Sequence, residues 1–234
     1  MRRTSPDAIS PAQLYARQPW SDAWTVEGVT QLLEPMVQPE RRHKIRQVLS
    51  QRKRSVTVLM DAPYDPHNGA AILRSADAFG LQEINLLPRE EPFLASSVVS
   101  KGTERWVDVA QHRTPDAAIS GLQSAGYELI STHPEGELVP EDLGTLDRVC
   151  LVLGNEHDGI RPELAQACRR SVRIPMFGFV ESLNVSVAAA LLIRAACYNR
   201  PADLAPPDFE RLYARGLYRT VKRAREILAA AEPR

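Results

Sequence analysis

Two kinds of apolar pattern alternate along residues 54–200. Short apolar runs, several of them rich in β-branched residues, predict strands, and longer segments with apolar residues at every third or fourth position predict helices. The expected strands cover residues 56–60, 83–87, 106–110, 127–132, 149–153 and 172–174. The expected helices cover residues 68–79, 115–124, 161–167 and a segment that starts near residue 184. Strands separated by helices of this length predict an α/β fold with a mostly parallel sheet covered on both faces.

The segments that follow the expected strands differ in composition from the strands themselves. They are rich in glycine, proline, asparagine and acidic residues, and they cover residues 61–68, 132–136, 154–159 and 175–182. Open parallel sheets bind their ligands at the carboxyl ends of the strands. We therefore expect the functional site to lie where these segments meet.

Helical patterns also flank the core. A short helix is expected at residues 26–33, a basic helix at residues 39–52 and a final amphipathic helix at residues 208–231. The pattern therefore divides the chain into a basic, largely helical extension (residues 1–53), a core domain (residues 54–200) and a C-terminal basic helix (residues 201–234). Beyond the short helix, the proline-interrupted residues 1–38 predict no further element.

Positive charge is concentrated in the two extensions, although the chain as a whole has no net charge. The sequence holds 29 lysines and arginines and 29 aspartates and glutamates. The basic clusters consist of Arg41, Arg42, Lys44, Arg46, Arg52, Lys53, Arg54, Arg211, Arg215, Arg219, Lys222, Arg223 and Arg225. Such runs are typical of solvated helix faces, but two of them around one core also suit a surface that follows nucleic-acid phosphates.

The composition narrows the class of protein. Hydrophobic residues make up 44% of the chain and charged residues 25%, which is typical of a soluble globular protein. No apolar run reaches the roughly 18 residues that span a bilayer, and the N-terminal residues lack the apolar stretch of a secretory signal. We therefore expect a cytoplasmic protein with no membrane partner. The three cysteines lie far apart and form no cluster with histidines, so we expect neither disulfides nor a metal site.

Three segments carry a more specific signal: PHNGAAILRSADAFG (66–80), LVLGNEHDGIRPEL (151–164) and IPMFGFVESLNVSVA (174–188). In order and spacing they resemble the three motifs of the SpoU branch of the SPOUT RNA methyltransferases, and the resemblance covers residues 54–200. It implies a SPOUT-type parallel sheet with a C-terminal trefoil knot, S-adenosyl-L-methionine as cofactor, and a homodimer. A Rossmann-type site is the natural alternative for a cofactor pocket, but no GxGxxG follows a strand.

The resemblance also assigns roles to individual residues. The implied catalytic set is Arg74, Asn68, Glu156, Ser182 and Asn184, and the implied cofactor-binding set is Thr132, Gly154, Ile174 and Leu183. The two asparagines could equally cap helices, and each glycine could equally form a plain turn.

Arg74 can be interpreted in three ways. The family account makes it a general base or an activator of the hydroxyl group. A guanidinium with a pKa above about 12 is a poor base, so a role in gripping a phosphate and orienting the ribose suits it better. On an arbitrary helix, Arg74 would instead pair with Asp77 at the surface.

The function that the resemblance implies is transfer of a methyl group from S-adenosylmethionine to a ribose 2′-hydroxyl of RNA. The basic extensions look like those with which tRNA-modifying members hold tRNA, so the substrate implied first is a guanosine in the tRNA D-loop. Ribosomal RNA and the tRNA wobble ribose remain alternatives, as does an RNA-binding protein that has lost catalysis. Two residues depart from the motifs, His157 and Glu181, and Glu181 would bring a negative charge near RNA phosphates.

Overall fold

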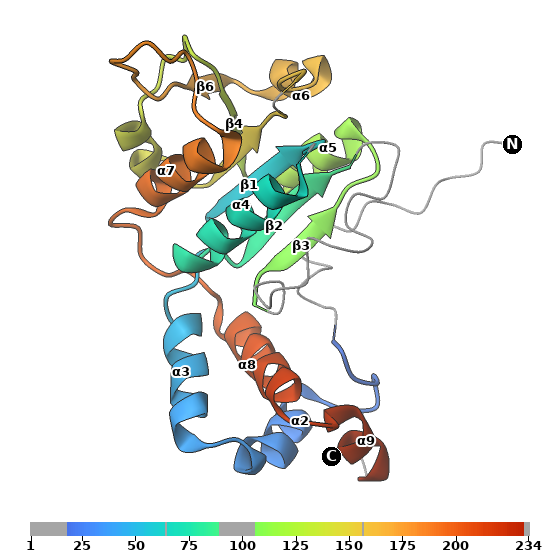
Figure 1. Cartoon of the computed structure of the whole chain (residues 1–234). Coiled ribbons are helices and arrows are strands. Elements are labelled where there is room, and N and C mark those ends of the chain that lie inside the picture. Colours follow the sequence, from blue (N-terminus) through green and yellow to red (C-terminus); the bar gives the residue numbers. More distant parts are fainter. Residues whose placement is uncertain (1–17, 64, 89–105, 156, 232–234) are drawn as a thin grey trace, which may run out of the picture. The chain divides into compact units, whose positions relative to one another are not determined.

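The computed structural model describes residues 18–63, 65–88, 106–155 and 157–231 (Figure 1). Within this part the chain forms two compact units. The sheet unit lies within residues 53–201, and the helical unit joins residues 18–52 to residues 202–231. The two extensions that flank the core in the sequence therefore belong largely to one unit. None of the described helices has the length and hydrophobicity required to cross a lipid bilayer.

The described part of the sheet unit contains a six-stranded sheet in which every paired strand runs parallel to its neighbour. The order across the sheet is β3-β2-β1-β5-β4-β6. The strands are β1 Val56–Asp61, β2 Glu83–Leu87, β3 Asp108–Gln111, β4 Glu128–Thr132, β5 Val149–Leu153 and β6 Arg170–Val172. The helices are α4 Pro66–Ala78, α5 Pro115–Ser124, α6 Pro162–Ala167 and α7 Val185–Cys197, with a 3₁₀ helix, η3, at Pro140–Thr145. The predicted parallel α/β fold is confirmed.

Two apolar cores cover the two faces of this sheet. On one face, α4, α7 and η3 contribute Ile72, Leu192 and Leu143 to one buried cluster. The second cluster contains Leu122 of α5 and Leu164 of α6. β1 and β5 are buried along their whole length between these layers, which is why they read as nearly continuous apolar runs in the sequence.

A connected set of polar side chains crosses this mostly apolar sheet. Asn85 Nδ2 donates to Thr57 Oγ1 at 3.0 Å and to Glu83 Oε1 at 3.3 Å, so Asn85 Oδ1 is the acceptor that faces His112 Nε2 at 2.7 Å. All four residues are buried. Burial lowers the pKa of His112 from 6.5 to about 4, so the imidazole is neutral at neutral pH and donates from Nε2.

Turn residues set several element boundaries, and one strand begins earlier than expected. Gly80 and Gly126 follow α4 and α5 with φ of 86° and 83°, the left-handed conformation that ends helices. β6 covers Arg170–Val172, so its predicted position at residues 172–174 is wrong. The reason is pairing: Thr132 is the last residue of β4 and lies opposite Val172, so the ladder ends there.

The chain wraps around the carboxyl end of β6. β4 pairs with β6 on one side, and Leu138 forms a parallel bridge with Val172 on the other. The Leu138 amide donates to the Ser171 carbonyl at 3.0 Å, and the Arg173 amide donates to the Leu138 carbonyl at 2.9 Å. A Cβ on Gly136 would lie 2.6 Å from the Val172 carbonyl carbon, so this close crossing requires glycine.

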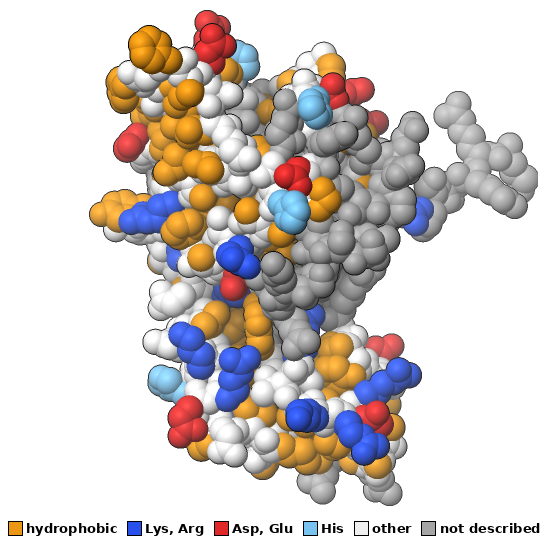
Figure 2. All heavy atoms as spheres, in the orientation of Figure 1, with side chains coloured by type: hydrophobic (Ala, Val, Ile, Leu, Met, Phe, Trp, Pro, Cys, Tyr) orange, Lys and Arg blue, Asp and Glu red, His pale blue; other side chains and the backbone are white. Residues whose placement is uncertain are grey.

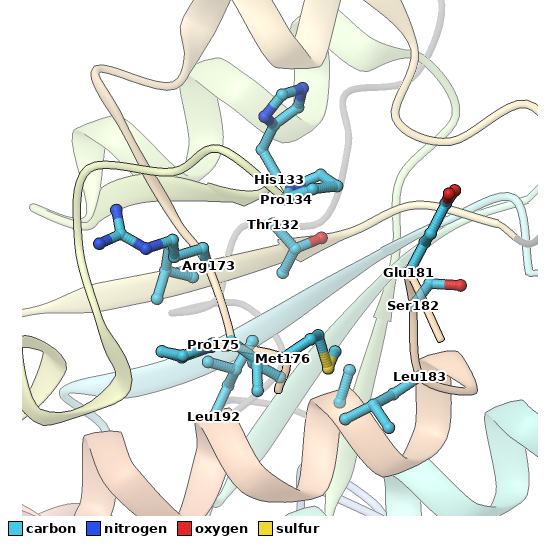
Figure 3. Close-up of a pocket in the computed structure, with 13 residues that line it drawn as sticks. Thr132, His133, Pro134, Arg173, Pro175, Met176, Glu181, Ser182, Leu183 and Leu192 are labelled. Carbon is cyan, nitrogen blue, oxygen red and sulfur yellow. The ribbon is translucent and has the colours of Figure 1, made fainter. Parts of the chain in front are cut away.

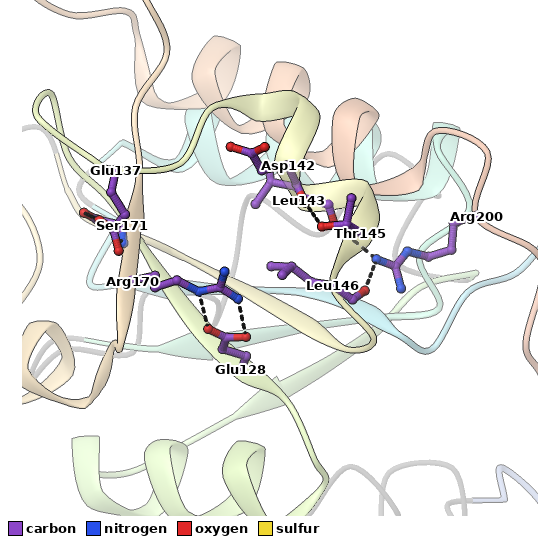
Figure 4. Close-up of polar contacts among 9 residues, drawn as sticks. All are labelled: Glu128, Glu137, Asp142, Leu143, Thr145, Leu146, Arg170, Ser171 and Arg200. Atoms are coloured by element: carbon purple, nitrogen blue, oxygen red, sulfur yellow. Dashed lines mark hydrogen bonds and ion pairs between the residues drawn. The ribbon is translucent and has the colours of Figure 1, made fainter.

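Side chains fasten this crossing (Figure 4). Arg170 donates to Glu128 through two hydrogen bonds of 2.7 Å, and this contact lowers the pKa of the Glu128 carboxyl group. Glu137 Oε2 accepts from Ser171 Oγ at 2.8 Å.

A separate set of hydrogen bonds holds the end of α7. Arg200, just after α7, donates to the carbonyl oxygens of Ala196, Asp147, Leu143 and Leu146. The segment that precedes β5 is thereby tied to the end of α7.

The helical unit is built from both ends of the chain. Its elements are α2 Val26–Leu33, η1 Glu34–Met36, α3 Pro39–Leu49, α8 Pro206–Thr220 and α9 Ala224–Ala230. α8 packs against α2 and α3. The single final helix predicted at residues 208–231 is wrong, because Arg223 adopts φ 60° between α8 and α9. No glycine or proline marks this break in the sequence, and it allows Ala224 and Leu228 of α9 to be buried.

One arginine of the helical unit is held by an aromatic ring and two acids. The Arg46 guanidinium lies over the Tyr213 ring, with Cζ 3.7 Å from its centroid. Its Nη2 lies 3.4 Å from Glu34 Oε1 and its Nη1 lies 4.0 Å from Glu210 Oε1. The Tyr213 hydroxyl donates to Glu34 at 2.5 Å, and this bond, helped by Arg46, lowers the pKa of the Glu34 carboxyl group.

Other basic residues of this unit have different environments. Arg52 and Arg215 are buried, while Arg211 and Arg223 pair with acids three residues away at 3.4 Å and 3.6 Å. The interpretation of both basic runs as solvated helix faces is therefore wrong for Arg52 and Arg215. Among the described residues of this unit, the exposed lysines and arginines that make no hydrogen bond or ion pair with a described residue are Lys44, Lys222 and Arg225. Figure 2 shows basic side chains spread over the surface of the helical unit.

Candidate active site

A pocket of about 500 Å³ opens beside the carboxyl ends of β4 and β6 (Figure 3). The residues that follow β4, the residues that follow β6 and the turn before α7 form it, and α7 closes one side. Its lining consists of Thr132, His133, Pro134, Val172, Arg173, Ile174, Pro175, Met176, Glu181, Ser182, Leu183, Ala188 and Leu192. Two of the strand-end segments singled out in the sequence, residues 132–136 and 175–182, thus contribute to one pocket.

Three of the four residues predicted to bind a cofactor line this pocket: Thr132, Ile174 and Leu183. Ile174 and Leu183 form apolar walls together with Leu192. The Thr132 hydroxyl donates to the Val152 carbonyl at 3.4 Å, which orients it against the neighbouring strand. The pocket therefore combines an apolar interior with polar groups at the strand ends, as small-molecule sites commonly do.

The fourth residue, Gly154, has a different neighbourhood. It follows β5 and is not part of the pocket lining, and a Cβ on it would lie 2.3 Å from the Gly159 carbonyl carbon. Glycine is therefore needed to close the 154–159 turn, in which Asn155 and Gly159 exchange backbone hydrogen bonds of 3.1 Å and 3.2 Å. A Cβ on Gly178 would meet open space. A cofactor contact for Gly154 stays a prediction, and a larger residue there would first disturb this turn.

A pair of asparagines joins the first and third motif segments. Asn184 Nδ2 donates to Asn68 Oδ1 at 3.1 Å. The same Asn184 caps α7, because its Oδ1 accepts from the Ser186 amide at 2.8 Å and from Ser186 Oγ at 2.6 Å. The cap fixes which way the Asn184 amide points, and its NH₂ group therefore faces Asn68, which is buried in α4. Asn184 both caps a helix and builds the site.

The other predicted catalytic residues have distinct environments. Ser182 lines the pocket and its side chain is exposed. Arg74 is exposed on α4, outside the pocket lining, and it makes no hydrogen bond or ion pair with any described residue. The alternative surface pair with Asp77 is therefore not formed. Glu156 lies outside the described residues.

An ion pair that sequence reasoning missed ties the end of β1 to the second motif segment. Asp61 ends β1 with its side chain fully buried, and its Oδ1 lies 2.6 Å from Arg161 Nε. Its Oδ2 accepts from the Arg161 amide at 2.7 Å, while Arg161 Nη2 donates to the carbonyls of Leu87 and Pro88 at 3.4 Å and 3.3 Å. The start of α6 is thereby fixed to the ends of β1 and β2. An acid at the end of an apolar strand was the available signal, but nothing in the sequence names its partner.

An apolar surface, here called the α7 patch, lies beside the pocket. It consists of exposed side chains from the β6–α7 segment and from α7 and its end: Phe177, Phe179, Val180, Val187, Leu191 and Tyr198. Phe177, Leu191 and Tyr198 also line a hollow of about 1040 Å³ that reaches η3. Hydrophobic side chains gather over this part of the sheet unit in Figure 2. Exposed apolar side chains gathered in one region are typical of contact surfaces.

Known proteins are similar to this chain in sequence. Residues 55–194 match the model described as the SpoU rRNA Methylase family. A tRNA (guanosine(18)-2′-O)-methyltransferase of Escherichia coli K12 is 33% identical over 163 residues, which are 69% of this chain and 71% of that protein. The family match, residues 55–194, contains all three motif segments identified in the sequence.

Solved structures share the fold. The TrmH/SpoU tRNA modifying enzyme of Aquifex aeolicus superposes with a TM-score of 0.67 at 26% identity, over 78% of this chain and 98% of that one. The SpoU methyltransferase AviRb of Streptomyces viridochromogenes, solved in complex with the cofactor AdoMet, superposes with a TM-score of 0.56 at 25% identity, over 61% of this chain and 59% of that one.

Proposed function

The chain belongs to the SpoU rRNA methylase family, and from this premise we propose that it methylates tRNA: it transfers a methyl group from S-adenosyl-L-methionine to the ribose 2′-hydroxyl of a D-loop guanosine. One observation carries the proposal. The contact between Asn184 and Asn68 joins the first and third family motifs next to a pocket lined by Thr132, Ile174 and Leu183. The tRNA (guanosine(18)-2′-O)-methyltransferases among the relatives support tRNA as the substrate.

The pocket fits S-adenosylmethionine in size and in chemistry. A volume of about 500 Å³ falls within the usual range of small-molecule sites. Ile174, Leu183 and Leu192 offer apolar walls for an adenosine, and a charged amino-acid tail can stay at the polar rim, where its charges keep contact with water. When bound, the cofactor supplies a methyl group activated by a cationic sulfur. Thr132, Ile174 and Leu183 are the residues that would hold it.

The reaction requires that the ribose 2′-oxygen is aligned with the methyl group and that the hydroxyl proton is removed. We assign the alignment to Arg74, because its guanidinium is exposed and makes no hydrogen bond or ion pair with a described residue. A guanidinium can hold a phosphate through two parallel hydrogen bonds, and a fixed phosphate fixes the adjacent ribose. The phosphate then assists removal of the proton. Asn68 and Asn184 fix the loops around the substrate, and Ser182 lies at the pocket where the ribose would enter.

We assign the body of the tRNA to the helical unit. The exposed basic residues Lys44, Lys222 and Arg225 make no hydrogen bond or ion pair with a described residue, so their charges are available to phosphates. This set is smaller than the charge clusters of the sequence, because Arg52 and Arg215 are buried and Arg46 lies over Tyr213. A tRNA-modifying role places the protein in the cytoplasm.

We further propose that the protein works as a homodimer through the α7 patch. An apolar patch on one protomer can be covered by the same patch of a second copy around a two-fold axis. Leu191→Glu would place a charge in the middle of this contact. Sedimentation velocity should then show a monomer where the unmodified protein sediments as a dimer, and an unchanged sedimentation coefficient would contradict the assignment.

The family resemblance also implies a trefoil knot, and the wrapping around β6 supports it. The segment from Thr132 to Leu138 encloses the end of β6, and α7 follows β6 directly in the chain. We propose that the knot is built from residues 127–132, 149–159 and 174–190, with the pocket at its strand ends.

Methylation of defined RNAs tests the function. Purified protein with labelled S-adenosylmethionine should methylate a tRNA transcript, and the label should map to one D-loop guanosine. A matched transcript with 2′-deoxyguanosine at that position, which lacks the acceptor hydroxyl, should take up no label. Labelling only of ribosomal RNA or of the wobble ribose would replace the substrate, and absence of labelling in every RNA would reject catalysis.

A further inference from the structure

Glu181 carries a charge that the proposed mechanism does not use. It lies directly before Ser182 in the β6–α7 segment and lines the pocket. Its side chain is exposed and makes no hydrogen bond or ion pair with any described residue. Among the residues that line the pocket, it is the one acid. An unpaired carboxylate therefore stands at the mouth of the cofactor pocket.

The positive charge of the pocket lies elsewhere. Arg173 is the one lysine or arginine among the lining residues, and its Nη1 donates to the Gly136 carbonyl at 2.5 Å. In Figure 3, Arg173 lies on the opposite side of the pocket from Glu181. The Glu181 side of the mouth is therefore negative, with no described side chain that neutralises it.

The cofactor and its product differ by one charge. S-adenosylmethionine carries a sulfonium, an ammonium and a carboxylate, for a net charge of +1. After methyl transfer the sulfur is a neutral thioether, so S-adenosylhomocysteine has no net charge. The charged half of either molecule belongs at the wet rim, since the apolar walls formed by Ile174, Leu183 and Leu192 suit the adenosine half.

We propose that Glu181 is a specificity-determining residue that favours the methylated cofactor over the spent one by charge, a role that rests on the methyltransferase function proposed above. The carboxylate attracts the cofactor before transfer more strongly than the product after it. Loss of the sulfonium charge therefore weakens binding at the moment when the product has to leave. A neutral residue at position 181 would remove this difference and leave the apolar contacts intact.

The expected effect is modest because Glu181 is exposed. One pair of unit charges about 6 Å apart in a largely aqueous environment corresponds to about a threefold to tenfold difference in affinity. Salt should screen it, since the Debye length falls from about 10 Å at 0.1 M to about 3 Å at 1 M ionic strength.

Isothermal titration calorimetry on the full-length protein tests the proposal with three ligands: S-adenosylmethionine, S-adenosylhomocysteine and sinefungin, an analogue with a protonated amine in place of the sulfonium. Glu181→Gln should lower the preference for S-adenosylmethionine over S-adenosylhomocysteine by about threefold to tenfold, and sinefungin should follow S-adenosylmethionine. Glu181→Asp should keep most of the preference. Glu135→Gln, an exposed acid in the turn after β4 that does not line the pocket, is the matched control and should change nothing.

A second measurement needs no variant. The preference of the unmodified protein should shrink as ionic strength rises, and the Glu181→Gln protein should show little salt dependence. An unchanged preference in Glu181→Gln, or a salt-independent preference in the unmodified protein, overturns the role of Glu181 and leaves the methyltransferase function standing. If the unmodified protein binds none of the three ligands, the proposed function itself fails and this role fails with it.

Discussion

The site residues of the sheet unit and two arginines of the basic helices differ in whether their side chains are paired. In the sheet unit, Arg74 on α4 and both Glu181 and Ser182 before α7 are exposed, and neither Arg74 nor Glu181 pairs with a described residue. In the basic helices, Arg46 is held by a ring and two acids, and Arg215 is buried. A side chain kept unpaired is available to a ligand, whereas one held by neighbours stabilises the fold. The density of charge in a sequence does not distinguish the two.

The largest effect should come from the unpaired arginine of the sheet unit. Arg74→Ala should lower single-turnover methylation at least ~100-fold, because it removes a positioning group, while S-adenosylmethionine affinity stays near that of the unmodified protein. Arg74→Lys should recover only part of the rate, since a lysine cannot form the bidentate contact. Arg113→Ala is a matched control, because Arg113 is also exposed in the sheet unit and makes no hydrogen bond or ion pair with a described residue. An unchanged rate in Arg74→Ala would contradict the assignment.

The sheet unit also has a buried polar group, and it should respond to pH. The pKa of His112 is about 4 in the folded protein against 6.5 for an unperturbed histidine, so the unfolded chain binds a proton first as the pH falls. The stability that depends on a neutral His112 is present above pH 6.5 and is lost progressively as the pH falls toward 4. The free energy of unfolding should fall by about 2 kcal/mol between pH 7 and pH 5 from this group.

Urea unfolding at both pH values checks this. His112→Gln keeps a donor for Asn85 and has no imidazole to protonate, so the free energy of unfolding should fall less between pH 7 and pH 5 than in the unmodified protein. Equal losses in the two proteins would show that other groups set the pH dependence.

A paired arginine of the helical unit should matter for stability and little for RNA. Arg46→Ala removes the contact with the Tyr213 ring and the pair with Glu34, which should lower the free energy of unfolding by about 1 kcal/mol. Its effect on the salt dependence of tRNA binding should be small, because its charge is already offset by acids. Chemical denaturation and filter binding on the same preparation separate the two readouts. A large change in the salt dependence with no change in stability would reverse the assignment.

The smallest effect should come from an unpaired lysine on the same helix. Lys44→Ala should leave the free energy of unfolding unchanged within about 0.5 kcal/mol. It should reduce the slope of log affinity for tRNA against log salt by about 0.7 to 0.9, the contribution of one phosphate contact. Point changes of this kind test the RNA surface better than deletion of residues 207–234, since α8 supplies the buried Leu212 and Leu217 of the helical unit.

Much of the fold could be predicted from the sequence because local patterns determined it. The ranges of β2, α5 and β5 agree with the structure residue for residue, and Gly80 and Gly126 end their helices in the left-handed conformation. The wrong predictions concern elements whose ends depend on a neighbouring segment of the fold. β6 ends where β4 ends, and the break before α9 depends on the burial of Ala224 and Leu228 rather than on a helix-breaking residue.

The candidate site shows the same limit. The motif segments predicted Thr132, Ile174 and Leu183 at one pocket, and the structure brings Asn68 and Asn184 into contact. The sequence could not reveal that Gly154 is required by the backbone of Gly159, nor that Asp61 meets Arg161 across 100 residues. Both facts depend on segments that become neighbours only in three dimensions.

The wrapping of the chain around β6 has a consequence for biosynthesis. β6 lies between β4 and Leu138, so the turn from His133 to Leu138 has to pass around the end of β6 when the protein folds. Contacts such as Glu128 with Arg170 join distant positions of the chain and are slow to form. A ribosome delivers β4 and this turn before β6, and α7 with Arg200 after both. During synthesis from the N-terminus, the turn that encloses β6 is therefore made first and β6 second. Arg200, which donates to four carbonyl oxygens, follows them and can then tie the end of α7 to the segment before β5.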